Sequence, residues 1–156
     1  MYQKEYFIKS GITDFISDFL KLEGKNILVT GGAGFIGSSM ARALLVEKAE
    51  VFVFDNYSSG SKKLIAEVED KIEQIEGNIL DNDLDRVFSE NKIDHIFHLA
   101  AEPYIPSCYE RPKDFFETNA NGTLNVLLAA KKSRVSRLLY FSSSEVCLLS
   151  SFVSSV

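Results

Sequence analysis

Four glycines occur within seven residues, from Gly31 to Gly37, between an apolar run and an amphipathic stretch. Read from Gly32, the segment has the spacing G-x-G-x-x-G, and read from Gly31 it has the spacing G-x-x-G-x-x-G. Glycine permits the backbone torsions of a sharp turn, and its missing side chain lets a ligand approach the backbone. The pattern therefore predicts a tight strand-to-helix connection of the kind that binds phosphate groups at the start of a helix.

Short apolar runs alternate with helical patterns from residue 26 onward. Such runs indicate parallel strands in a sheet that is covered on both faces. We expect strands at residues 26–30, 51–54, 72–75, 95–99 and 138–141, and helices at 35–48, 62–69, 81–88 and 113–132. Because crossover connections are right-handed, the predicted fold is α/β, a Rossmann-type doubly wound parallel sheet of order 3-2-1-4-5, truncated after strand five.

Two of these helices carry a more detailed prediction. Asp81 is a candidate N-cap for the helix that ends at Phe88. In the helix over residues 113–132, one face is formed by Phe116, Ala120, Thr123, Leu127 and Ala130.

Several ligand-binding segments converge on one edge of the predicted sheet. The glycine turn, Asp55, the loop after His98 and the serines after Phe141 all follow strands, and ligands bind at the carboxyl ends where the strand order reverses. Asp55 comes about 20 residues after the turn, where the dinucleotide fingerprint places an acidic residue. Its carboxylate suits ribose hydroxyls and repels a 2′-phosphate, and no arginine stands beside it. NAD is therefore favoured over NADP, and a structural turn without a ligand is the alternative.

Composition argues against several other functions. The formal net charge of −5 disfavours nucleic-acid and anionic-membrane binding, because both need a basic face. Cys108 and Cys147 form no disulfide framework, and His95 and His98 have no second ligand cluster nearby, so no metal site is expected. The sequence shows neither a secretory signal nor an apolar run of about 20 residues, so we expect a soluble, cytoplasmic protein.

The residues from Thr30 to Ser38 resemble the opening of the extended short-chain dehydrogenase/reductase family. The similarity is closer to its NAD-dependent epimerase/dehydratase group, whose members act on nucleotide sugars. Further matches in order and spacing occur at residues 55–60, 98–101, 119–123 and 141–146. The resemblance implies oxidation of a sugar hydroxyl by hydride transfer to NAD.

The resemblance also implies a role for each matching position in binding the cofactor. The pyrophosphate would be surrounded by Gly31, Gly34, Phe35, Ile36 and Gly37. The adenosine ribose would be held by Asp55 and Asn56, with Ser59 and Gly60 near the phosphates. The adenine would lie along Asn78 and Ile79, although the family usually has an aspartate in place of Asn78. The cofactor channel would be lined by Leu99, Ala100 and Ala101. Asn119 would brace the loops near the nicotinamide.

The family's catalytic residues are matched only in part. Ser144 matches the serine or threonine that hydrogen-bonds the reacting sugar hydroxyl, although capping of the strand end would explain it without the resemblance. The family also needs a tyrosinate and a lysine one helical turn later, and neither residue type occurs in residues 145–156. One Tyr-x-x-x-Lys, from Tyr109 to Lys113, precedes the serine in a loop before a helix and contains Pro112, so we interpret it as a chance match.

These observations predict three parts: a helical extension over residues 1–24, an NAD-binding Rossmann domain over 25–146, and an irregular tail over 147–156, with the substrate domain absent. The expected product is a truncated, inactive form of an enzyme whose full-length relatives bind a nucleotide sugar and form a homodimer. The alternatives are a non-catalytic NAD-binding module and a structural module that a partner chain completes. Without the second half, strand five and the helix over 113–132 are expected to expose apolar surface.

Overall fold

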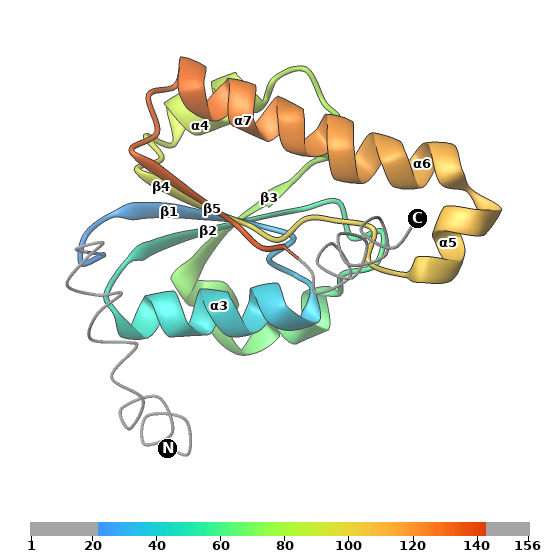
Figure 1. Ribbon diagram of the computed structural model, residues 1–156. Coiled ribbons are helices and arrows are strands. Elements are labelled where there is room, and N and C mark those ends of the chain that lie inside the picture. Colours follow the sequence, from blue (N-terminus) through green and yellow to red (C-terminus); the bar gives the residue numbers. More distant parts are fainter. Residues whose placement is uncertain (1–21, 143–156) are drawn as a thin grey trace, which may run out of the picture.

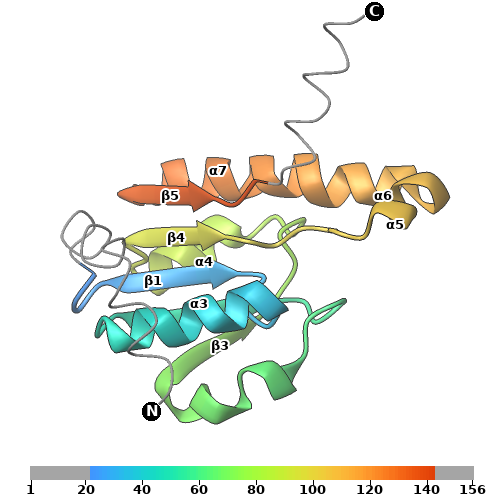
Figure 2. The ribbon, with the colours of Figure 1, turned by 60° about the horizontal axis from the view of Figure 1, so that its bottom comes forward.

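The computed structural model describes residues 22–142, which form a five-stranded parallel sheet between two layers of helices (Figure 1). The strands are β1 (Asn26–Thr30), β2 (Glu50–Asp55), β3 (Ile72–Glu76), β4 (His95–His98) and β5 (Arg137–Tyr140). The strands lie in the order β3-β2-β1-β4-β5. Figure 2 shows β1, β4 and β5 side by side, with β3 and β5 at the two edges of the sheet. The α/β class, the Rossmann-type topology and the strand order predicted from the sequence are confirmed.

The helices alternate with the strands, but they contain more breaks than the sequence indicates. In chain order they are α3 (Phe35–Val46), the 3-10 turns η1 (Lys62–Leu64) and η2 (Ala66–Lys71), α4 (Leu84–Glu90), α5 (Ile105–Glu110), α6 (Pro112–Phe116), the π-helix η3 (Glu117–Gly122) and α7 (Thr123–Lys132). No helix between residues 22 and 142 is long and apolar enough to cross a membrane.

Consecutive side chains of β1 enter two separate cores. Ile27 and Val29 pack in the cluster that includes side chains of α3, whereas Leu28 packs in the cluster that includes side chains of α4 and α7. All three are 0 % exposed. Figure 1 shows the same division, with α3 below the sheet and α4 and α7 above it. Burial on both faces explains why β1 is apolar throughout rather than alternating with polar residues.

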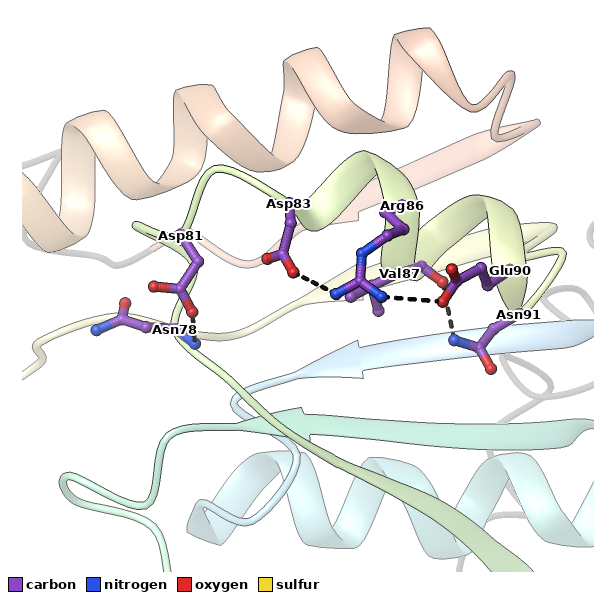
Figure 3. A network of polar contacts seen from close by, with 7 residues as sticks. All are labelled: Asn78, Asp81, Asp83, Arg86, Val87, Glu90 and Asn91. Atoms are coloured by element: carbon purple, nitrogen blue, oxygen red, sulfur yellow. Dashed lines mark hydrogen bonds and ion pairs between the residues drawn. The ribbon is translucent and has the colours of Figure 1, made fainter.

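Asp81 does not cap α4, as the sequence suggested. The helix begins at Leu84, with Asp83 in the cap position. Asp81 instead accepts a hydrogen bond from the backbone N–H of Asn78 at 2.9 Å, which closes the turn after β3 (Figure 3). Asp83 pairs with Arg86 at 2.6 Å. An aspartate satisfies the N–H groups of a turn as well as those of a helix start, so the sequence pattern does not distinguish the two.

The single helix predicted over residues 113–132 is interrupted by the π-helix η3. A π-helical turn holds more residues than an α-helical turn, so it rotates the faces of the two flanking helices relative to each other. α7 buries Val126, Ala129 and Ala130, whereas Leu127 is 46 % exposed. The predicted face, which grouped Leu127 with Ala130, was therefore wrong. The outer side of α7 exposes Leu127 together with Leu124 and Leu128.

Candidate cofactor site at the carboxyl edge of the sheet

The glycine turn contacts the loop that follows β4. Gly31 has a φ of +68°, a conformation that residues with a side chain rarely adopt. A Cβ atom on Gly31 would lie 2.7 Å from the backbone nitrogen of Ala100 and 2.9 Å from its Cα. The N–H of Gly31 donates to the carbonyl oxygen of Phe54 at 2.9 Å. The turn therefore joins β1, β2 and the loop after β4 at the reversal of strand order, where parallel sheets bind ligands.

The start of α3 has the features of an anion site. Gly34 occupies the N-cap position and provides no capping side chain. A Cβ atom on Gly37 would overlap the carbonyl oxygen of Gly31, so only glycine allows the first turn of α3 to pack on the glycine turn. Phe35 and Ile36 are 81 % and 61 % exposed although they are apolar. An uncapped helix start directs N–H groups and the positive end of the helix dipole toward an anion, which fits a pyrophosphate.

Asp55, at the end of β2, is 6 % exposed and supports the glycine turn. Its Oδ2 atom accepts a hydrogen bond from the N–H of Ala33 at 2.9 Å, and its Oδ1 atom accepts one from the N–H of Tyr57 at 2.8 Å. Motif spacing does not reveal this bracing, because it cannot distinguish a carboxylate that binds a ligand from one that binds backbone. A carboxylate has about four lone-pair positions, so these two bonds leave room for ribose hydroxyls.

The loop after β2 carries the other residues expected near the adenosine ribose and the phosphates. Asn56 and Ser59 are exposed, and Gly60 is half-buried. A Cβ atom on Gly60 would lie 2.9 Å from Oδ1 of Asp55 and 3.1 Å from the carbonyl oxygen of Ala33. The loop therefore lies close to both the carboxylate and the glycine turn. Its contact with a cofactor stays a prediction.

Lys62 places a positive charge beside the ring of Tyr57, in the segment after β2, that the fingerprint motif does not include. Its Nζ atom lies 3.3 Å from the carboxylate of Glu76 and 4.7 Å from the centroid of the Tyr57 ring. The charge of this lysine is thus balanced by a carboxylate on the neighbouring strand β3. The preference for NAD over NADP remains consistent with this arrangement.

Asn78 and Ile79 lie in the connection between β3 and α4. Figure 3 shows Asn78 in this connection. The side-chain oxygen of Asn78 accepts a hydrogen bond from the N–H of Leu80 at 3.0 Å. Ile79 is 4 % exposed, and its Cγ1 atom would lie 2.7 Å from a Cβ atom on Gly122. The side chain of Ile79 therefore belongs to the core, and only its backbone can lie along a base.

The loop over residues 99–101 is supported from both sides. The N–H of Ala100 donates to Oγ1 of Thr30 at 3.3 Å. Asn119, in η3, accepts a hydrogen bond from the N–H of Glu102 at 2.8 Å and donates to its carbonyl oxygen at 3.0 Å. The structure thus contains the bracing expected of Asn119. Its proximity to a nicotinamide stays a prediction.

His98, the last residue of β4, is 1 % exposed and joins β1 to α7. Its Nδ1 atom lies 2.6 Å from Oγ1 of Thr30, and its Nε2 atom lies 3.1 Å from Oγ1 of Thr123. Burial lowers the pKa of His98 from 6.5 to about 4, so the imidazole is neutral at physiological pH. These partners are 68 and 25 residues away in sequence, and for this reason the strand pattern did not identify them.

The expected catalytic residue, Ser144, lies outside the described residues. Tyr109 lies in α5, not in a loop as predicted, and it is 82 % exposed. Pro112 begins a separate helix, α6, which contains Lys113, so the two members of this Tyr-x-x-x-Lys pattern are on different helices. Proline favours the first position of a helix, which explains the break. Within the described part of the chain, no group of three or more His, Cys, Asp or Glu side chains could hold a metal ion.

Comparison with known proteins identifies the family of this chain. Residues 27–147 match the model of the NAD dependent epimerase/dehydratase family. The UDP-N-acetyl-alpha-D-glucosaminuronate decarboxylase of Bacillus cytotoxicus is 37% identical over 123 residues, which cover 78% of this chain and 37% of that protein.

Two solved structures share the fold. An epimerase from Methanothermobacter thermautotrophicus has a TM-score of 0.76 at 39% identity, over 86% of this chain and 39% of that one. The UDP-glucose-4-epimerase of Stenotrophomonas maltophila, with bound NAD and formylated UDP-arabinopyranose, has a TM-score of 0.74 at 26% identity, over 78% of this chain and 38% of that one. The chain thus spans less than two fifths of the length of each of these three proteins.

Proposed function

This chain belongs to the NAD-dependent epimerase/dehydratase family, and we propose that its residues 25–146 form the NAD-binding domain of a nucleotide-sugar epimerase or dehydratase. Residues 1–24 would be an N-terminal extension, and residues 147–156 a tail. The observation that carries the proposal is the close packing of Gly31 on the backbone of Ala100 beside an uncapped helix start. The decarboxylase and the NAD-bound epimerase described above act on or bind UDP-sugars, which supports a nucleotide sugar as the substrate class.

The residues of the site fit NAD in both of its halves. We assign the pyrophosphate to the turn from Gly31 to Gly37, at the uncapped start of α3. The adenosine ribose would be bound by Asp55 and Asn56, and the adenine by Asn78 together with the backbone of Ile79. The second half of the cofactor would lie along the loop over residues 99–101. The chemistry that NAD supplies when bound is the acceptance of a hydride from the sugar carbon.

We expect NAD, but not NADP, to raise the thermal unfolding midpoint of the 156-residue chain. Binding to the folded state alone at a hundredfold excess over Kd adds about 2.7 kcal/mol of stability. In Asp55→Ala the NAD-dependent shift should disappear, because the ribose loses its acceptor and the glycine turn loses its brace. Differential scanning fluorimetry with and without each nucleotide measures the shift.

The matched control is Asp94→Ala. Asp94 also accepts a backbone hydrogen bond, from Asn26 at 3.0 Å, but it precedes β4 and lies at the opposite end of the sheet. Asp94→Ala should lower the midpoint without changing the NAD-dependent shift. Equal shifts with NAD and NADP would contradict the specificity, and no shift in the unaltered chain would contradict the proposed function.

We further propose that these 156 residues bind NAD without completing a turnover. Ser144 would hydrogen-bond the reacting sugar hydroxyl. Removal of the proton from that sugar hydroxyl needs a general base held in place, and residues 145–156 contain neither tyrosine nor lysine. Incubation of the purified chain with NAD and UDP-glucose should therefore leave the sugar nucleotide unchanged, with no epimer and no dehydrated product detected by NMR. A product that forms only with the chain and disappears in Ser144→Ala would contradict this expectation.

One observation favours a module that a partner chain completes. Three leucines on the outer side of α7, Leu124, Leu127 and Leu128, are 51 %, 46 % and 57 % exposed. An apolar surface of this kind is typical of an interface with a second copy or another chain. Size-exclusion chromatography with light scattering distinguishes the cases, because a monomer that binds NAD favours the first proposal and a defined oligomer favours completion by a partner.

A further inference from the structure

The side chain of His98 connects two segments that are distant in sequence. It lies between the hydroxyl of Thr30, at the end of β1, and the hydroxyl of Thr123, at the start of α7. The ring is buried, and both of its nitrogen atoms have a hydrogen-bond partner. Neither partner carries a charge, so the contacts orient the ring without ionising it.

The second bond made by Thr123 determines where the proton on His98 lies. The hydroxyl of Thr123 donates its single proton to the carbonyl oxygen of Asn119 at 2.8 Å. Toward His98 it can then only accept, so the proton of the neutral ring must be on Nε2. Nδ1 is left without a proton and accepts from the hydroxyl of Thr30, whose oxygen in turn accepts from the N–H of Ala100.

The four hydrogen bonds therefore all point in one direction, from donor to acceptor. The two ends of this series of hydrogen bonds reach the same loop. At one end, Ala100 donates to Thr30. At the other end, the backbone carbonyl oxygen of Asn119 accepts a hydrogen bond from the hydroxyl of Thr123. The side chain of Asn119 is in turn hydrogen-bonded to the backbone N–H and carbonyl oxygen of Glu102. The loop from Leu99 to Glu102 is thus fixed at two points that are connected through His98. Its backbone at Ala100 is the surface on which Gly31 packs.

We propose that His98 is a positioning residue for the cofactor. His98 holds the loop over residues 99–102 at the distance from the glycine turn that the second half of NAD requires. This role rests on the proposed NAD site. Asp55 places the adenosine on the β2 side of the switch point, so the other half of a dinucleotide lies on the β4 side, along this loop. In this arrangement the adenosine half would lie away from His98 and its hydrogen-bond partners.

The test compares Thr123→Val, which keeps the shape but removes the hydroxyl, with Thr123→Ser, which keeps the hydroxyl. Titration calorimetry on the 156-residue chain measures Kd for NAD and for ADP, which contains the adenosine and the two phosphates but lacks the nicotinamide riboside. Thr123→Val removes both hydrogen bonds of the Thr123 hydroxyl, to His98 and to Asn119. It should weaken NAD binding about tenfold and change ADP binding by less than about twofold. Thr123→Ser should restore the NAD affinity.

The outcomes separate this role from the proposed function. Binding of neither NAD nor ADP by the unaltered chain would overturn the proposed function and this role with it. Equal losses for NAD and ADP in Thr123→Val, or no rescue by Thr123→Ser, would overturn the role of His98 alone. Nitrogen NMR of the ligand-free chain provides an independent readout, and we expect a proton on Nε2 of His98 and none on Nδ1. A proton on Nδ1 would overturn the proposed direction of the hydrogen bonds through His98.

Discussion

Gly31→Ala should lower the free energy of unfolding by about 2–5 kcal/mol and abolish NAD binding. A φ of +68° costs a residue with a Cβ atom about 1–2 kcal/mol. The new methyl group would also lie 2.7 Å from the backbone nitrogen of Ala100, and such overpacking adds about 1–3 kcal/mol. The glycine turn and the loop after β4 must then separate, which removes the geometry that the pyrophosphate requires. Urea unfolding and NAD titration measure the two effects.

Gly24→Ala is the matched control for Gly31→Ala. Gly24 has nearly the same conformation, with a φ of +69°, but a Cβ atom there would meet nothing within 4 Å. Its substitution should cost only the conformational term of about 1–2 kcal/mol and leave NAD binding unchanged. The difference between the two variants therefore isolates the contact between the turn and Ala100. Equal destabilisation by both variants would show that this contact is not tight in solution.

The stability of the chain should fall by about 3 kcal/mol through His98 as the pH is lowered from 6.5 to about 4. In the unfolded chain His98 takes up a proton at its ordinary pKa of 6.5, whereas burial lowers the pKa in the folded chain to about 4. Between these values the unfolded state binds more protons, so acidification favours unfolding. One pKa unit corresponds to about 1.4 kcal/mol, which gives this magnitude. The contribution of neutral His98 to the free energy of unfolding is therefore complete above pH 6.5 and lost near pH 4.

His98→Gln isolates this contribution, because glutamine can donate and accept hydrogen bonds but does not titrate in this range. The unaltered chain should lose its stability advantage over His98→Gln as the pH falls from 6.5 to about 4. The titration of other groups affects both proteins equally and cancels in the difference between their free energies of unfolding. Urea unfolding at a series of pH values measures it, and NMR titration of the His98 ring gives its pKa directly. A pKa near 6.5 in the folded chain would contradict the prediction.

Most of the fold could be predicted because it depends on local patterns. The apolar run from Ile27 to Val29 and the glycines that follow it specify a strand, a turn and a helix start within about ten residues of sequence. The errors arose where one local signal allows two structures. Asp81 satisfied the amide groups of a turn rather than those of a helix, and the π-helix η3 interrupted the single helix predicted over residues 113–132.

The candidate site could be predicted as a set of residues but not as a set of contacts. Sequence spacing placed Asp55 at the end of β2, and yet its bonds to Ala33 and Tyr57 depend on how the turn closes over it. Ile79 was expected to lie along the adenine, but its side chain is in the core, because Gly122 approaches it from η3.

The sequence by itself determined the order of the elements, the position of the glycine turn and the edge at which we expect ligands to bind, because strand and helix periodicity and right-handed crossovers leave few arrangements. Only the tertiary structure decided the buried face of α7 and the partners of His98. The π-helix η3 rotates α7 by an amount that residue periodicity does not encode. Thr30 and Thr123 meet His98 only after β1, β4 and α7 have packed together, because these hydrogen bonds join residues 68 and 25 positions apart.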